Sequence, residues 1–61
     1  MGKLTGKQRA FIDFYLGEAR FNATKAARLA GYSGNDDTIR SIGSQNLTKP
    51  HIREEIDIKL E

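Results

Sequence analysis

The segment from Asn22 to Leu47 constrains the fold most strongly, because a glycine turn divides it into two helical halves. Asn22 is a strong helix N-cap, and small residues follow it at helical spacing: Ala23, Ala26, Ala27 and Ala30. Gly31 then ends this helix, which we place over residues 23–30, in the left-handed conformation that costs glycine least. Two short helices joined by a tight glycine turn have the spacing of a helix-turn-helix.

The helix after the turn has two different faces. Its candidate N-caps are Asn35, Asp36 and Asp37. The inward face would hold Ile39, Ile42, Gly43 and Asn46, with Leu47 at its margin. Glycine inside a helix costs about 1 kcal/mol relative to alanine, so we expect Gly43 to touch the alanine face of the preceding helix. The outward face would hold Arg40, Ser41, Ser44 and Gln45.

Two further helices flank this unit. Thr5-Gly6-Lys7-Gln8 matches a capping box that opens the first helix. The apolar residues of this helix lie on more than one face: Phe11, Ile12, Phe14, Tyr15 and Leu16. We interpret this as burial under the C-terminal helix; the alternative is a surface shared with a neighbouring chain. Pro50 opens the fourth helix, whose apolar ladder is Ile52, Ile56 and Leu60. The sequence therefore predicts an all-α, four-helix domain over residues 1–61.

Composition narrows the possible functions. A chain of 61 residues without cysteine has neither disulfides nor thiolate metal sites to stabilise it. Because His51 is the only histidine, we predict no metal, no cofactor and no enzymatic activity. Asp36-Asp37 fits helix capping better than a metal pair. The sequence has no membrane-spanning run and no signal-peptide core, so we expect a soluble, intracellular protein.

Charge is unevenly distributed along the chain. Through Arg53 there are nine Lys/Arg and four Asp/Glu, a net charge of +5, whereas the remainder carries −3. A basic body suits a polyanionic partner, although a generic mixed-charge surface is the alternative interpretation.

Nucleic acid is the polyanion that the outward face fits best. Arginine can fork onto guanine, glutamine onto adenine, and serine can bond to base edges or phosphate, so we predict base contacts from Arg40, Ser41, Ser44 and Gln45. The predicted phosphate neighbours are Lys3, Lys7, Lys25, Arg28 and Lys49. The alternatives are a surface ion pair of Arg40 with Asp36 or Asp37, and simple solvent exposure of the two serines.

A longer series of residues resembles a known family. The series runs Leu4-Thr5, Lys7-Gln8, Phe11, Tyr15, Asn22-Ala23-Thr24, Ala26-Ala27, Ala30-Gly31-Tyr32-Ser33, Ile42-Gly43-Ser44, Leu47, Pro50, Ile52-Arg53 and Ile56. Its order and spacing are similar to the N-terminal domain of bacteriophage terminase small subunits. The segment 34–37 departs from that pattern, since it is longer and more acidic than we expect for the family.

The resemblance implies a role in viral genome packaging in the host cell cytoplasm. Terminase small subunits recognise the packaging-initiation site on double-stranded viral DNA and regulate the large subunit, which holds the ATPase and nuclease. They self-associate into rings through a region that follows the DNA-binding domain. We expect residues 50–61 to lead into that region of a longer natural protein, and ring formation by this chain to be weak or absent.

Two other functions stay open at this point. One is a helix-turn-helix transcriptional regulator of phage or mobile-element origin. The other is a protein-interaction module, in which the apolar and acidic C-terminal helix docks a partner.

Overall fold

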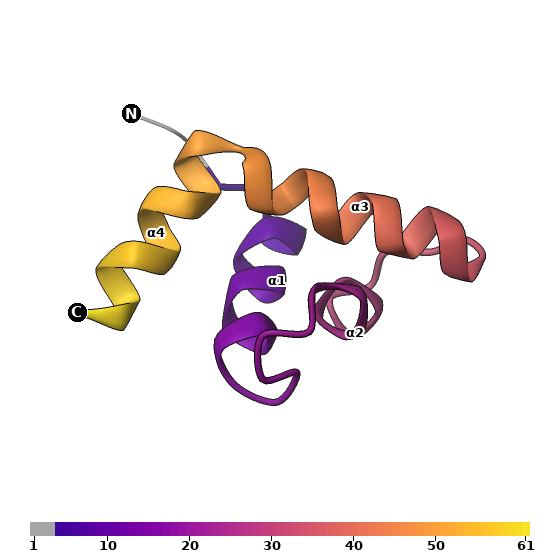
Figure 1. The fold of residues 1–61 in the computed structure, drawn as a ribbon, viewed down its shortest axis with the longest axis horizontal. Helices are drawn as coiled ribbons and strands as arrows, with labels where there is room; N and C mark the ends of the chain where they lie inside the picture. Colours follow the sequence, from indigo (N-terminus) through magenta and orange to yellow (C-terminus); the bar gives the residue numbers. More distant parts are fainter. Residues whose placement is uncertain (1–3) are drawn as a thin grey trace.

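The computed structural model describes residues 4–61, which form four helices and no strand (Figure 1). The helices are α1 (Gly6–Leu16), α2 (Ala23–Leu29), α3 (Asp36–Thr48) and α4 (Pro50–Leu60). The all-α, four-helix prediction is therefore confirmed. Helix α2 stops one residue before the predicted end, because Ala30 serves as its C-cap.

Three of the helices begin at the polar caps that the sequence predicts. The capping box of α1 is complete: the backbone N–H of Gln8 donates to Thr5 Oγ1, and the N–H of Thr5 donates to Gln8 Oε1, both at 3.1 Å. Asn22 caps α2 by accepting from the N–H of Lys25 at 3.0 Å. Asn35 caps α3 by accepting from the N–H of Thr38 at 2.8 Å, which leaves both neighbouring aspartates in the first turn. Helix α4 instead begins with Pro50, as predicted.

The core forms around α1, which lies between α2 and α4 while α3 runs across one end (Figure 1). Phe11 and Ile12 of α1 are almost fully buried. The other buried apolar side chains are Ala19, Ala26, Ala27, Ile39, Ile52 and Ile56. Since α4 contributes two isoleucines and packs on α1, the structure agrees with burial under the C-terminal helix for Phe11 and Ile12. Phe14, Tyr15 and Leu16 are only half-buried.

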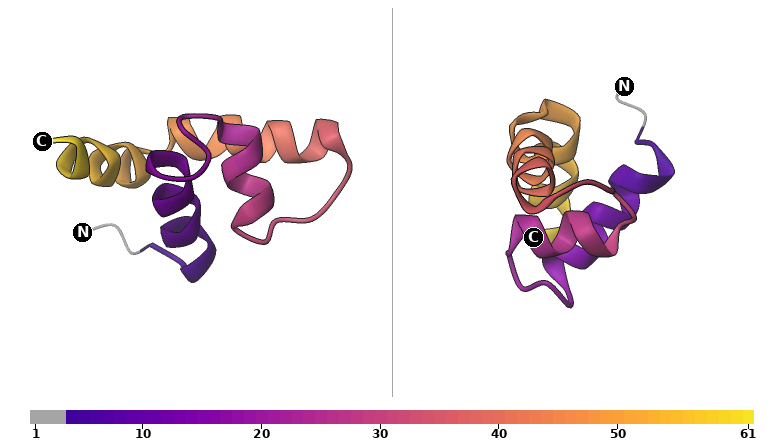
Figure 2. Two further views of the ribbon diagram at one scale, coloured as in Figure 1. Left: turned by 90° about the horizontal axis from the view of Figure 1, so that it is seen from below. Right: turned by 90° about the vertical axis from the view of Figure 1, so that its right-hand side faces the viewer.

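The apolar ladder of α4 is buried at its first two positions only. Ile52 and Ile56 are buried, but the Leu60 side chain is 58% exposed. The C-terminal end of α4 points away from the other helices, as two views show (Figures 1 and 2). Helical periodicity places Leu60 on the same face as Ile52 and Ile56 but gives no information on how far the neighbouring helices follow α4.

Helices α2 and α3 cross in close contact, as predicted (Figure 2). Gly43 is buried at the crossing, where an added β-carbon would lie 2.7 Å from the Ala23 carbonyl oxygen. In the connection between these helices, Gly31 and Gly34 have φ angles of 102° and 139°, which glycine adopts at the least cost. The half-buried Tyr32 packs on the core and fixes this turn.

The link between α1 and α2 contains two left-handed residues that the sequence did not predict. Arg20 and Phe21 have φ angles of 48° and 67°. Backbone hydrogen bonds hold the link, since the N–H of Ala19 donates to Phe14 O and that of Phe21 to Tyr15 O, both at 2.8 Å. The Phe21 ring meets the Tyr15 ring edge-on at 5.5 Å, yet its side chain stays 58% exposed.

Candidate nucleic-acid interface

The outer face of α3 presents four polar side chains together. Arg40, Ser41, Ser44 and Gln45 are all exposed, and these four residues line one shallow, open hollow. Helical spacing puts them there because Ile39, Gly43 and Asn46, which alternate with them, face inward and are buried. The face can donate and accept hydrogen bonds to a flat or convex partner, and its open shape does not enclose a small molecule.

The rotation of α3 is fixed by its inner face. Asn46 is only 2% exposed, and its Nδ2 donates to the hydroxyl of Tyr32 at 3.5 Å. Together with the glycine contact at the crossing, this bond joins α3 to the turn before it. The outer face is therefore held by a rigid element, which favours precise recognition.

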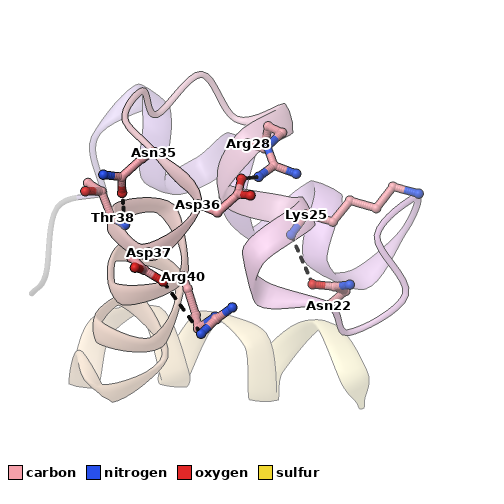
Figure 3. Close-up of polar contacts among 8 residues, drawn as sticks. All are labelled: Asn22, Lys25, Arg28, Asn35, Asp36, Asp37, Thr38 and Arg40. Atoms are coloured by element: carbon pink, nitrogen blue, oxygen red, sulfur yellow. Dashed lines mark hydrogen bonds and ion pairs between the residues drawn. The ribbon is translucent and has the colours of Figure 1, made fainter.

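Arg40 also contacts an acid of its own helix. Its Nη1 lies 3.8 Å from Asp37 Oδ1, and the two side chains are 72% and 91% exposed (Figure 3). Of the two predicted partners, Asp37 is thus the one in contact. A pair this long and this exposed contributes little stability, because water screens it.

Arg28 makes the tighter ion pair, and it joins the two helices of the unit. Its Nη2 lies 2.6 Å from Asp36 Oδ1, so α2 and α3 are linked across the turn (Figure 3). The predicted role of Arg28 is a phosphate contact, and Asp36 is a partner that the sequence did not predict. The two residues are eight positions apart, and no helical register relates them.

The remaining predicted cations lie on three different elements. Lys25 is exposed in the first turn of α2, and its side chain extends away from the domain (Figure 3). Lys7 Nζ lies 5.4 Å from the centre of the Tyr32 ring, a cation–π contact beside the turn. Lys49 is half-buried between α3 and α4. Lys3 lies outside the described residues.

A second hollow has no counterpart in the sequence predictions. It is lined by Tyr15, Phe21, Leu47, Arg53, Ile56, Asp57 and Leu60. The sequence signal that could have revealed this hollow is Phe21, a large aromatic residue that lies between two predicted helices and belongs to neither of them.

Within residues 4–61, no three histidine, cysteine or acidic side chains gather as metal ligands would. None of the helices there is both long and apolar enough to cross a membrane.

Comparison with known proteins identifies the family. The sequence model of the terminase small subunit family matches residues 4–61. The chain is 50% identical over 58 residues to the terminase small subunits of Bacillus phages SF6 and rho15, covering 95% of this chain and 38% of each relative. It is 42% identical over 59 residues to that of Bacillus phage SPP1, covering 97% of this chain and 38% of the relative.

The chain thus spans well under half the length of these relatives. No solved structure matches it significantly. The family match over nearly the whole chain agrees with the motif series, the four-helix architecture and the glycine turn between α2 and α3. This chain belongs to the terminase small subunit family.

Proposed function

We propose that this chain is the DNA-binding domain of a phage terminase small subunit, with α2 and α3 forming a helix-turn-helix. Helix α3 would lie in the major groove as the recognition helix. The observation that carries the proposal is the outer face of α3, where four exposed polar side chains line one open hollow. Family membership supports the same assignment.

Each side chain of this face has a distinct proposed role. Arg40 would donate two hydrogen bonds to a guanine, and Gln45 would pair with an adenine. Ser41 and Ser44 would bond to base edges or phosphate oxygens. The proposed phosphate contacts are Lys3, Lys7, Lys25, Arg28 and Lys49, which would set affinity and register without reading sequence.

In the packaging reaction the domain would act without catalysis. It would recognise the packaging-initiation site on double-stranded viral DNA in the host cytoplasm and support the terminase large subunit. A full-length protein assembled as a ring would present several copies of this domain. Multivalency would then raise an affinity that is weak for one copy, because one small domain touches few phosphates.

A titration of fluorescently labelled duplex DNA tests the proposal. We expect binding that weakens strongly between about 50 mM and about 200 mM salt, because counterions are released when phosphates are neutralised. The double substitution Arg40→Ala, Gln45→Ala should weaken binding at least about tenfold, since each bidentate base contact is worth roughly 1–3 kcal/mol. Arg9→Ala, which removes one charge from α1, is the control and should change affinity less than about threefold.

Two outcomes would count against DNA binding by α3. One is the absence of binding at low salt. The other is an equal loss of affinity in the α3 variant and the α1 control, because the outer face of α3 would then have no special part in binding.

A second candidate role, protein interaction through α4, rests on its exposed apolar end. Ile58 and Leu60 are 56% and 58% exposed, and Leu60 lines the hollow beside Phe21. Leu60→Asp would abolish partner binding while leaving the core intact, whereas Ile56 is 5% exposed and cannot be changed without disturbing the core. Loss of large-subunit binding in Leu60→Asp with unchanged DNA binding would assign this role to α4.

A further inference from the structure

Two arginines of the proposed DNA surface are each held by an aspartate from the first turn of α3. Arg28 contacts Asp36 at 2.6 Å, and Arg40 contacts Asp37 at 3.8 Å (Figure 3). The first pair bridges two helices, while the second lies along one. The free domain therefore carries an internal acceptor for each of these arginines.

The helix does not need either carboxylate as its cap. Asn35 already provides the capping oxygen for α3, through its bond from the N–H of Thr38 at 2.8 Å. Both carboxylates interact favourably with the positive N-terminal end of the helix dipole. At an exposed site each such interaction is worth only about 0.3–1 kcal/mol. The two carboxylates are 85% and 91% exposed, so each arginine can leave its aspartate without exposing a buried charge.

We propose that Asp36 and Asp37 are specificity-determining residues, which hold Arg28 and Arg40 in the free domain and weaken binding to DNA that offers only backbone phosphates. This inference rests on the proposed function. A duplex that offers the arginine a better acceptor displaces the aspartate, at the small cost of breaking a water-screened ion pair. A guanine edge does so for Arg40, since it accepts two bonds in fixed geometry. Random-sequence DNA places a guanine edge opposite Arg40 in only a fraction of the possible registers.

The two aspartates have different expected effects. Releasing Arg28 adds one phosphate contact, so Asp36→Asn should tighten binding to any duplex by about threefold and steepen the salt dependence by about 0.9 in log–log slope. Releasing Arg40 frees a base-reading side chain. Asp37→Asn should therefore tighten binding mainly to unselected sequences and flatten the preference recovered by selection from a random duplex pool.

A double-mutant cycle separates release of the arginine from general loss of negative charge. The affinity of a random-sequence duplex is measured by fluorescence anisotropy for Asp36→Asn alone and in an Arg28→Ala background. If the gain acts through Arg28, it disappears in that background. If the carboxylate only repels phosphate, the gain persists. Asp13→Asn, which removes an exposed acid from α1, is the charge-matched control.

The outcomes are distinct. A gain of about threefold for Asp36→Asn that vanishes with Arg28→Ala supports the inference. A gain equal to that of Asp13→Asn, or one that persists without Arg28, overturns it while leaving DNA binding intact. If the unsubstituted domain and all variants fail to bind duplex at low salt, the proposed function itself falls. If thermal melting shows that Asp36→Asn is unfolded, Asp36→Ser takes its place. Helix α3 should tolerate this substitution as well, because Asn35 provides its cap.

Discussion

Substituting Gly43 by alanine tests the helix crossing that holds α3 in place. An added β-carbon would lie 2.7 Å from the carbonyl oxygen of Ala23, 2.9 Å from its carbonyl carbon and 3.1 Å from its β-carbon. The two shortest contacts are to backbone, which cannot rotate away as the end of a flexible side chain can. The helices must therefore move apart to accept the extra methyl group.

Two opposing effects set the size of the change. Alanine in place of a helical glycine stabilises by about 1 kcal/mol. Overpacking of a tight contact costs about 1–3 kcal/mol, and contact with backbone belongs at the upper end of that range. We therefore expect a net loss of about 2 kcal/mol, which lowers the Tm of a domain this small by roughly 8–16 °C.

Thermal melting followed by circular dichroism measures this loss. Gly6→Ala is the matched control, because Gly6 opens α1 and has nothing within 4 Å of an added β-carbon. That substitution should leave the Tm unchanged or raise it. Ala23→Gly should not rescue Gly43→Ala, since it leaves the backbone carbonyl in place. A Gly43→Ala variant as stable as Gly6→Ala would refute the close crossing.

Two further substitutions test the local bonds around this crossing. Asn22→Ala removes the cap of α2 and should lower the free energy of unfolding, measured in urea, by about 1 kcal/mol. Asn22→Asp keeps an acceptor and should lower it less. Equal losses in the two variants would contradict a capping role. Tyr32→Phe leaves the buried Asn46 amide without its hydroxyl acceptor and should lower the free energy of unfolding by about 0.5–1 kcal/mol. An unchanged urea midpoint would show that this long hydrogen bond contributes nothing to stability.

The helices and the outer face of α3 were predictable because they depend on short-range rules. Caps act within three residues, as Thr5 and Asn22 show. The position of Gly43 was informative for a related reason: a helical glycine on an inward face is costly unless another element comes close. Such patterns require only the sequence within one or two turns.

Features that depend on how the helices meet were not predictable in the same way. The partner of Arg28 is set by the path of the turn, which brings Asp36 beside it from the next helix. The exposure of Leu60 depends on the direction in which α4 leaves the other helices. The left-handed backbone at Phe21 follows from hydrogen bonds back to the last turn of α1, and no glycine marks the place.

An NMR titration of the isotope-labelled domain with duplex DNA tests most directly whether α3 is the DNA-reading helix. The account predicts that the largest amide and side-chain shifts fall on Arg40, Ser41, Ser44 and Gln45, with smaller shifts at the phosphate-facing lysines. Shifts confined to the end of α4 and the hollow beside Phe21, with the outer face of α3 unchanged, would contradict it.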